Sequence, residues 1–271
     1  MTAESTDKSK IAPIREVEVT RYVTPLREGG SLPAIVEADD LGTYVLKFRG
    51  AGQGTKVLIA ELLAGEIGRK LGLPIPELVF ANLDAAIGRN EGDPEIQELI
   101  ERSEGLNLGM DFLPGSFGFD ALQAQEFGAR LASEIVWFDA FMTNVDRTAR
   151  NTNMLIWHRE LWLIDNGASI YPQYSGPTFP SRAQTTFPQI RTHVLLPIAS
   201  EIEAADERLS KRITAGDLRD LVETIPEGWL GGTAYENSEA ERAAYIEYLT
   251  NRLEGPRAFV KEAIDARAQL V

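Results

Sequence analysis

The spacing of apolar residues changes once along the chain, and this change divides the sequence into two parts with different secondary structure. Short runs with strand-like spacing fill the first part, as at 16–20 and 43–48. After residue 118 helical spacing dominates, and 121–144 is a long amphipathic segment of this kind. The sequence therefore predicts an α+β protein with two lobes, the first rich in strands and the second mostly helical.

Turn and capping residues give the expected boundaries. One main helix in the first part is predicted to begin at Thr55 as its N-cap and to stop at Gly72, and Thr214 and Ser238 are the expected N-caps of helices in the last part. The segment 105–118 holds four glycines and a proline, which indicates an irregular crossing between the lobes. We expect a flexible tail at 1–13, a β-rich lobe at 14–108, a hinge at 109–118 and a helical lobe with the catalytic loop at 119–271.

Composition removes several kinds of chemistry. The 271 residues include no Cys and only two His, so disulfides, a cysteine nucleophile, thiolate zinc sites and Fe–S clusters are excluded. A net charge of −14 makes non-specific binding to nucleic acid unfavourable, because phosphate binding needs a positive surface. The first ten residues are polar and no apolar run is long enough to span a membrane, so we expect a cytoplasmic protein.

The strongest chemical signal is a set of polar residues after the long amphipathic segment. Asp146 is followed five residues later by Asn151, and fourteen residues further on by Asp165 in an Asp-Asn-Gly turn. Phosphoryl transfer needs one carboxylate to accept or orient the proton of the attacking hydroxyl, and an amide with a second carboxylate to hold Mg²⁺. Each residue alone is typical of a turn, but their order and spacing favour a catalytic loop with Asn151 and Asp165 as metal ligands.

A phosphate-binding lysine is predicted on the strand before the main helix. Lys47 lies in the middle of an apolar run, where an ammonium without a partner would be costly to bury. Glu61 on the following helix is the expected partner, and Glu66 is the competing one. Alone, Lys47 would more often point to solvent, but beside the catalytic-loop pattern it favours a kinase-type pair.

Two glycine-rich stretches compete for the role of phosphate-covering loop. The stretch at 50–56 lacks the adjacent Gly-Lys-Ser/Thr of a P-loop, so we interpret it as a turn between strand and helix. Gly29, Gly30 and Ser31 precede the Lys47 strand, where backbone N–H groups can bind anions. We therefore assign these three residues to nucleotide binding.

The ordered motifs at 44–48, 72–74, 105–115, 144–153 and 163–168, together with Glu61, resemble the HipA-like kinase family. This family lies within the wider group that includes protein kinases and phosphoinositide kinases. The resemblance implies a two-lobed kinase-like fold, with Asp146 as catalytic base and Lys47 paired with Glu61. It also implies that the adenine binds backbone groups of the crossing segment at Met110, Asp111, Phe112 and Leu113.

Two positions depart from the best-known members of the family: Thr148 replaces a His, and Asn166 replaces the Phe of the metal-binding motif. Neither change removes a charge that the chemistry needs. The resulting hypothesis is an ATP- and Mg-dependent phosphotransferase acting on a hydroxyl acceptor, Ser or Thr on a protein. A small-molecule kinase and a nucleotide-binding pseudokinase are the alternatives, and 172–192 occupies the expected place of an acceptor loop.

The negative net charge adds one expectation about the binding of a polyanionic nucleotide. The binding site must be locally cationic even though the chain is acidic. Lys47 is expected to supply this charge, helped by Arg147 or Arg150. The expected partners are ATP and an unidentified phosphoacceptor, with no membrane.

Overall fold

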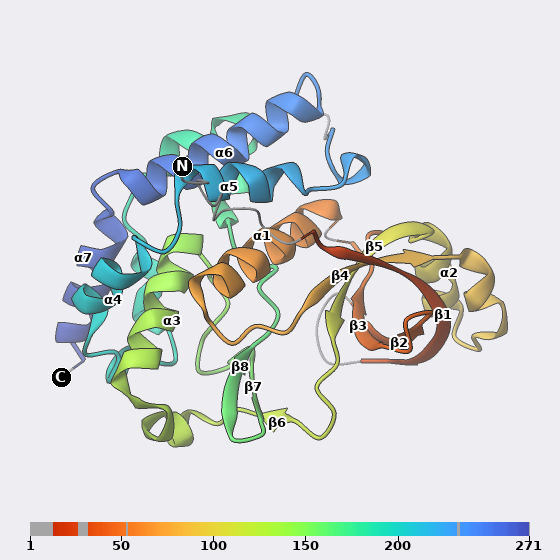
Figure 1. Cartoon of the computed structure of the whole chain (residues 1–271), viewed down its shortest axis with the longest axis horizontal. Helices are drawn as coiled ribbons and strands as arrows, with labels where there is room; N and C mark the ends of the chain where they lie inside the picture. Colours follow the sequence, from red (N-terminus) through yellow and green to blue (C-terminus); the bar gives the residue numbers. More distant parts are fainter. Residues whose placement is uncertain (1–12, 27–31, 53, 232–233, 271) are drawn as a thin grey trace, which may run out of the picture.

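The computed structural model describes residues 13–26, 32–52, 54–231 and 234–270. The tail predicted at 1–13 lies almost entirely outside these residues. The described chain forms a small barrel and a larger helical part, and the helix α1 (Thr55–Leu71) lies between them (Figure 1). Among the described residues, no helix is both long and apolar enough to cross a membrane.

Five strands close into a barrel in the N-terminal part of the chain. In chain order they are β1 (Arg15–Pro25), β2 (Ala34–Ala38), β3 (Thr43–Lys47), β4 (Leu78–Leu83) and β5 (Gly105–Asp111). Their order around the barrel is β1-β2-β3-β5-β4, and the barrel closes through a parallel pairing of β1 with β4. Apolar side chains of alternate residues fill its interior, and helix α2 (Pro94–Arg102) adds Ile96, Leu99 and Ile100 to the same core.

The first half of the crossing segment is a strand rather than the irregular chain that its glycines predict. Residues 105–111 form β5, which pairs with both β3 and β4. The apolar alternation of Leu106, Leu108 and Met110 outweighs the glycines there. Gly109 suits the strand because a Cβ at this position would lie 2.8 Å from Val79 Cγ2. Gly109, in the interior of the strand, therefore marks a close approach to a neighbouring strand.

Helix α1 has the predicted extent but begins differently from the prediction. Its N-cap is Gly54 with φ 66°, not Thr55, and no side chain caps it. The Thr55 hydroxyl donates instead to the carbonyl of Trp229, 174 residues away, at 2.8 Å. The C-terminal end follows the sequence: Gly72 adopts φ 84°, the left-handed conformation that glycine enters without strain.

The C-terminal part holds a three-stranded sheet and most of the helices. The strands are β6 (Phe117–Gly118), β7 (Met154–Trp157) and β8 (Glu160–Leu163), in the order β6-β7-β8. The α-helices are α3 (Gly128–Met142), α4 (Ile202–Leu209), α5 (Ala215–Glu223), α6 (Ser238–Glu254) and α7 (Ala258–Ala268). The 3₁₀ helices of the whole chain are η1 (Ala85–Asn90), η2 (Ala121–Phe127), η3 (Tyr171–Arg182), η4 (Pro188–Thr192), η5 (Leu196–Ile198) and η6 (Glu227–Trp229).

Two details differ from the predicted helices. The segment 121–144 is split into η2 and α3 at Gly128, whose φ of 77° interrupts the helix. Helix α6 is capped by Asn237 rather than by Ser238, since the Asn237 side chain accepts from the N–H of Ala240. Thr214 caps α5 as predicted, in a reciprocal capping box with Asp217.

The two hydrophobic cores do not coincide with the two parts of the chain. The barrel has its own core, but the apolar side chains of α1 belong to the large core that also contains α3 and α6. Gly68 of α1 allows this contact, because a Cβ there would lie 3.2 Å from Phe138 of α3. Helix α1 is therefore packed as part of the C-terminal core, although it precedes β4 and β5 in the sequence.

Candidate active site

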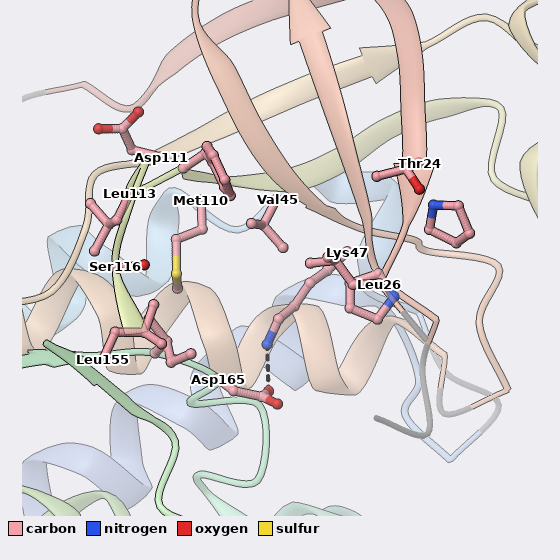
Figure 2. Close-up of a pocket in the computed structure, with 14 residues that line it drawn as sticks. Thr24, Leu26, Val45, Lys47, Met110, Asp111, Leu113, Ser116, Leu155 and Asp165 are labelled. Atoms are coloured by element: carbon pink, nitrogen blue, oxygen red, sulfur yellow. Dashed lines mark hydrogen bonds and ion pairs between the residues drawn. The ribbon is translucent and has the colours of Figure 1, made fainter. Parts of the chain in front are cut away.

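Lys47 stands at the centre of the candidate site with a carboxylate on either side. It is the last residue of β3, and its Nζ lies 2.5 Å from Glu61 Oε2 and 2.6 Å from Asp165 Oδ1. Glu61 is fully buried on α1. Asp165 follows β8 and the residue Ile164, and its carboxylate lies beside the Lys47 ammonium (Figure 2). Glu66, the competing partner, pairs with Arg69 instead. Three elements far apart in sequence thus meet at one buried ammonium.

The charges around Lys47 determine its protonation. Burial alone would lower the pKa of Lys47, but the negative charges of Glu61 and Asp165 together outweigh burial and raise its pKa above the ordinary value. The Lys47 charge in turn lowers the pKa of Asp165 below its ordinary range. At neutral pH the site therefore holds a cation beside an ionised carboxylate.

Asp146 and Asn151 lie together in a loop after α3. Asn151 Nδ2 donates to Asp146 Oδ2 at 2.7 Å, which leaves the amide oxygen of Asn151 for another partner. A second amide, Asn153, donates to the same Asp146 oxygen at 3.2 Å and to the backbone carbonyl of Asp165 at 3.4 Å. Asn153 thus connects the loop of Asp146 to the turn of Asp165, a role that the spacing of Asp146 and Asn151 does not indicate.

Two residues of this site have backbone conformations that are unusual for side-chain-bearing residues. Asp165 has φ 52° and Asn153 has φ 47°. Non-glycine residues enter this left-handed region at a cost, and such strain is concentrated at functional sites. The turn that carries Asp165 is therefore held by its surroundings rather than by local preference. Asn adopts this conformation more readily than most residues. This preference is the one feature of the sequence that indicates a special position at Asn153.

Arg147 holds the loop through buried hydrogen bonds, and its charge acts on the site only by adding to the effect of Lys47 that lowers the pKa of Asp165. It is fully buried and its guanidinium donates to Asp139 Oδ2 at 2.6 Å, to the Asn153 carbonyl at 2.5 Å and to Asn166 Oδ1 at 2.6 Å. The expectation that Arg147 helps bind a nucleotide is therefore wrong, because its donors are used inside the protein. Arg150 is exposed and does not line the cavity described below.

Asp139, on α3, collects the bonds that hold this loop in place. It accepts from Arg147, from Asn144 Nδ2 at 3.0 Å and from His193 Nε2 at 2.9 Å. Burial alone would raise the pKa of Asp139, but the Arg147 charge and the His193 hydrogen bond outweigh it and keep the pKa below its ordinary value. The sequence does not predict these hydrogen bonds, because a single Asp in an apolar helix belongs to no recognisable motif.

A cavity of about 740 Å³ opens beside Lys47 and Asp165. This volume lies in the range of pockets that hold small molecules. The cavity is lined by Thr24, Pro25, Leu26, Pro33, Val45, Lys47, Met110, Asp111, Phe112, Leu113, Ser116, Leu155, Ile164 and Asp165. Apolar side chains from both parts of the chain face it, and the charged pair stands at one end (Figure 2).

All four residues expected to contact an adenine line this cavity. Some of their backbone groups are already used: the Phe112 N–H donates to the Thr43 carbonyl at 3.0 Å, and the Leu113 carbonyl accepts from the Ser116 N–H at 3.2 Å. The Met110 side chain extends toward Leu155, whereas the carboxylate of Asp111 points away from Lys47 (Figure 2). The Asp111 N–H also donates to the Glu77 carbonyl at 2.8 Å, so neither this N–H nor the carboxylate serves a ligand beside Lys47.

Gly29, Gly30 and Ser31 lie outside the described residues, so their assignment to nucleotide binding stays a prediction. The described residues on either side of them, Leu26 and Pro33, line the cavity.

The donor set beside Lys47 fits a hard divalent cation. Asp165 is about half exposed, with a side-chain exposure of 52%, and Asn151 has an uncommitted amide oxygen. No group of three or more His, Asp or Glu side chains that could hold a metal exists among the described residues. Mg²⁺ needs no such cluster, because it binds one or two carboxylates together with water and substrate phosphates.

Comparison with known proteins adds independent information. The chain superposes on the crystal structure of a Helicobacter pylori proinflammatory kinase, CtkA, with a TM-score of 0.56 and 14% sequence identity. The superposition covers 95% of this chain and 99% of CtkA. The chain also superposes on the Golgi casein kinase with Mn/ADP bound, with a TM-score of 0.50 at 10% identity over 94% of this chain and 74% of that one. At such low identity these similarities show a kinase-like fold. No curated protein sequence matches the chain.

The sequence itself matches a family model more specifically. The model described as HipA-like kinase covers residues 18–256, which include the strand of Lys47, the loop of Asp146 and the turn of Asp165. The match spans both lobes of the kinase-like fold and all of the elements that meet at Lys47. The chain therefore belongs to the HipA-like kinase family.

Proposed function

We propose that this kinase transfers the γ-phosphoryl group of ATP to a hydroxyl acceptor, Ser or Thr on a protein, with the help of Mg²⁺. The observation that carries the proposal is the position of Lys47, bonded at once to Glu61 and Asp165 at the end of an apolar cavity. An ammonium fixed between two carboxylates is the arrangement with which kinases bind nucleotide phosphates.

Each residue of the site then has a defined task. Lys47 binds the α- and β-phosphates, and Glu61 holds the ammonium in place. Asp146 accepts or orients the proton of the acceptor hydroxyl, whose oxygen forms a bond to the γ-phosphorus. The bond from that phosphorus to the β–γ bridging oxygen breaks, and ADP leaves. Asn151 and Asp165 would hold the metal, which when bound neutralises charge on the phosphates.

The adenine would bind at the strand end. Because the Phe112 N–H and the Leu113 carbonyl are used internally, the Asp111 carbonyl and the Leu113 N–H are the groups that we propose for the adenine edge. Val45 and Leu155 would enclose the ring from the two lobes, since both line the cavity. A protein acceptor is the favoured choice in view of the structural similarity to a casein kinase.

The test is transfer of labelled phosphate from Mg·ATP to the chain itself or to components of a lysate, followed by mass spectrometry of the labelled species. Asp146→Asn and Asp165→Ala are each expected to lower transfer by at least about 100-fold, because each removes a group that acts in the reaction. Exposed Asp220→Asn is the matched control and should transfer at the native rate.

Unchanged transfer in both site variants, with folding verified by circular dichroism, would contradict the proposal. Label found only on a metabolite would assign a small-molecule acceptor. Binding of Mg·ATP by calorimetry without any transfer would identify a pseudokinase.

A further inference from the structure

We propose that Trp229 is a positioning residue that fixes helix α1 and thereby keeps Glu61 against Lys47. Trp229 belongs to η6 in the last fifth of the chain, far in sequence from every residue of the site. The inference rests on the proposed function, because it concerns the ion pair that would bind the phosphates. It assigns a role to a C-terminal segment that takes no part in the chemistry.

Trp229 contacts three elements of the N-terminal half. Its indole Nε1 donates to the carbonyl of Leu106 in β5 at 3.0 Å, and its ring meets Phe80 of β4 edge to face with centroids 5.7 Å apart. Its own carbonyl accepts from the hydroxyl of Thr55, the first residue of α1, at 2.8 Å. The side chain is 3% exposed, so these bonds are shielded from water. One residue thus joins the start of α1 to the barrel strands that carry the cavity.

Helix α1 depends on such contacts because its own start is weak. No side chain caps it and its first turn contains no acidic residue. The side chain of Gln173 meets the same turn, as its Nε2 donates to the Lys56 carbonyl at 3.3 Å while Lys56 Nζ donates to the Gln173 carbonyl at 3.2 Å. These bonds do not satisfy the free N–H groups of the first turn as a cap would, but they attach that turn to the C-terminal part of the chain.

The far end of α1 is tied to the same part of the chain. Lys70 Nζ lies 3.0 Å from Asp217 Oδ1 of α5, and Arg212 donates to the carbonyl of Leu71 at 2.8 Å. Glu61 lies between the two anchored ends, six residues after Thr55. With both ends held, α1 cannot swing away and carry Glu61 with it unless these bonds break.

The segment that holds α1 is itself held. Arg242 of α6 donates to the carbonyls of Val222 at 3.0 Å and Ile225 at 2.7 Å, just before η6, and pairs with Glu227 at 3.3 Å. A continuous set of contacts therefore runs from α6 through Trp229 to α1 and Glu61. These contacts hold the Lys47–Glu61 ion pair in its formed state, so no movement of α1 is needed to form it.

Hydrogen exchange tests the proposal without relying on activity. Thr55→Val removes the hydroxyl that bonds Trp229, and Trp229→Phe keeps a ring beside Phe80 but removes the N–H donor. Each is expected to speed exchange of the backbone amides of α1 about fivefold, the effect of one ordinary hydrogen bond, and to leave those of α3 unchanged.

The control is Thr20→Val. Thr20 of β1 is exposed and its hydroxyl also donates to a backbone carbonyl, that of Glu37 at 3.2 Å, but it lies outside the contacts that hold α1. This variant should leave exchange in α1 at the native rate. The proposal would be overturned if exchange in α1 were equally fast in Thr55→Val, Trp229→Phe and Thr20→Val.

Kinetics then test whether Trp229 acts through Glu61. The double variant Thr55→Val with Trp229→Phe should lower kcat several-fold when Glu61 is present, and should change it by less than a factor of about two in a Glu61→Gln background. A general loss of folding would lower kcat equally in both backgrounds. An equal fall in both, or no fall in either, would overturn the proposal.

The two proposals fail in different ways. If the native chain transfers no phosphate at all, the proposed function fails, and the exchange rates of α1 alone decide the role of Trp229. If the native chain transfers phosphate while the Thr55 and Trp229 variants behave like the Thr20 control, the proposed function stands and the positioning role fails.

Discussion

Arg252 is a buried cation that pairs with no carboxylate among the described residues. Its guanidinium donates to four backbone carbonyls, those of Ala140, Phe141, Ala183 and Thr185, at 2.6–3.2 Å. Two of these carbonyls belong to the last turn of α3, where a helix has unsatisfied acceptors and a partial negative charge. The loop of Asp146 begins a few residues later, so Arg252 fixes the point from which the candidate catalytic loop starts.

Replacing Arg252 by Met is expected to destabilise the fold strongly. The substitution removes the guanidinium donor from three buried carbonyls and from the part-buried carbonyl of Thr185, and we expect the free energy of unfolding to fall by about 3–5 kcal/mol. Urea denaturation at neutral pH measures this change. The matched control is Arg191→Met, since exposed Arg191 forms one ion pair with Glu262 and should contribute less than about 1 kcal/mol. Similar losses for the two variants would contradict the role of Arg252.

Single residues differ in how far the sequence reveals them. Lys47, Asp146, Asn151 and Asp165 are identifiable because phosphoryl transfer demands particular polar groups in a particular order. Asn153, Trp229 and Arg252 are not, because each acts through hydrogen bonds to backbone groups that only the fold brings near. Arg147 was predicted to bind a nucleotide because its charge is visible in the sequence, whereas its burial under the loop is not.

At the scale of elements, the close contact between α1 and the turn of Asp165 controls the geometry of the site. Gly167 lies where a Cβ would be 2.6 Å from Val57 Cγ1 and 3.4 Å from Glu61 Oε2. The turn can therefore pack against α1 only while residue 167 has no side chain. Real Cβ atoms do not approach carbon so closely, and one of the two elements would have to move.

Gly167→Ala is expected to lower kcat about tenfold by pushing α1 and the Asp165 turn apart, as about 1.4 kcal/mol of overpacking at the site would do. Adding Val57→Ala removes the methyl group that the new Cβ would strike, and should restore much of the loss. Gly118→Ala is the control, because a Cβ there meets no atom within 4 Å. Steady-state kinetics with saturating ATP measure all three, and a double variant no faster than Gly167→Ala alone would contradict this explanation.

The ends of an element can be predicted from the sequence where its capping residues and its tertiary contacts favour the same boundary. Helix α1 ends at Gly72 and α5 begins at Thr214 because capping residues act locally. The start of α1 and the strand β5 were not predicted correctly, since in both cases a distant partner decides. The Thr55 hydroxyl donates to the Trp229 carbonyl instead of capping the helix, and Gly109 of β5 allows close packing between strands instead of marking a loop.

At the scale of the whole molecule, the net charge of −14 means that the negative side chains repel one another and destabilise the folded chain. The ion pairs at the candidate site do not offset this repulsion. We expect the melting temperature to rise by about 2–4 °C, equivalent to about 1 kcal/mol, when NaCl is raised from about 10 mM to about 200 mM. Scanning calorimetry measures this shift. The buried pair of Lys47 and Glu61 is shielded from ions in solution and should contribute little to it.

A variant with less surface charge provides the control for the salt effect. Four exposed glutamates form no ion pair with other described residues, namely Glu126, Glu207, Glu223 and Glu254. Changing all four to Gln reduces the net charge from −14 to about −10 and should make the melting temperature less sensitive to salt. Equal salt sensitivity in the native and neutralised chains would show that repulsion is not the cause.

The core that α1 shares with the C-terminal helices also determines the order in which parts of the molecule can fold during synthesis. During synthesis the barrel strands, which have their own core, leave the ribosome long before η6 and α6 exist. Helix α1 must wait for those later residues before its apolar face is covered and its first turn is bonded. We therefore expect a nascent chain to remain without its Lys47–Glu61 pair until residues beyond Trp229 have emerged, so that the candidate site is completed late in synthesis.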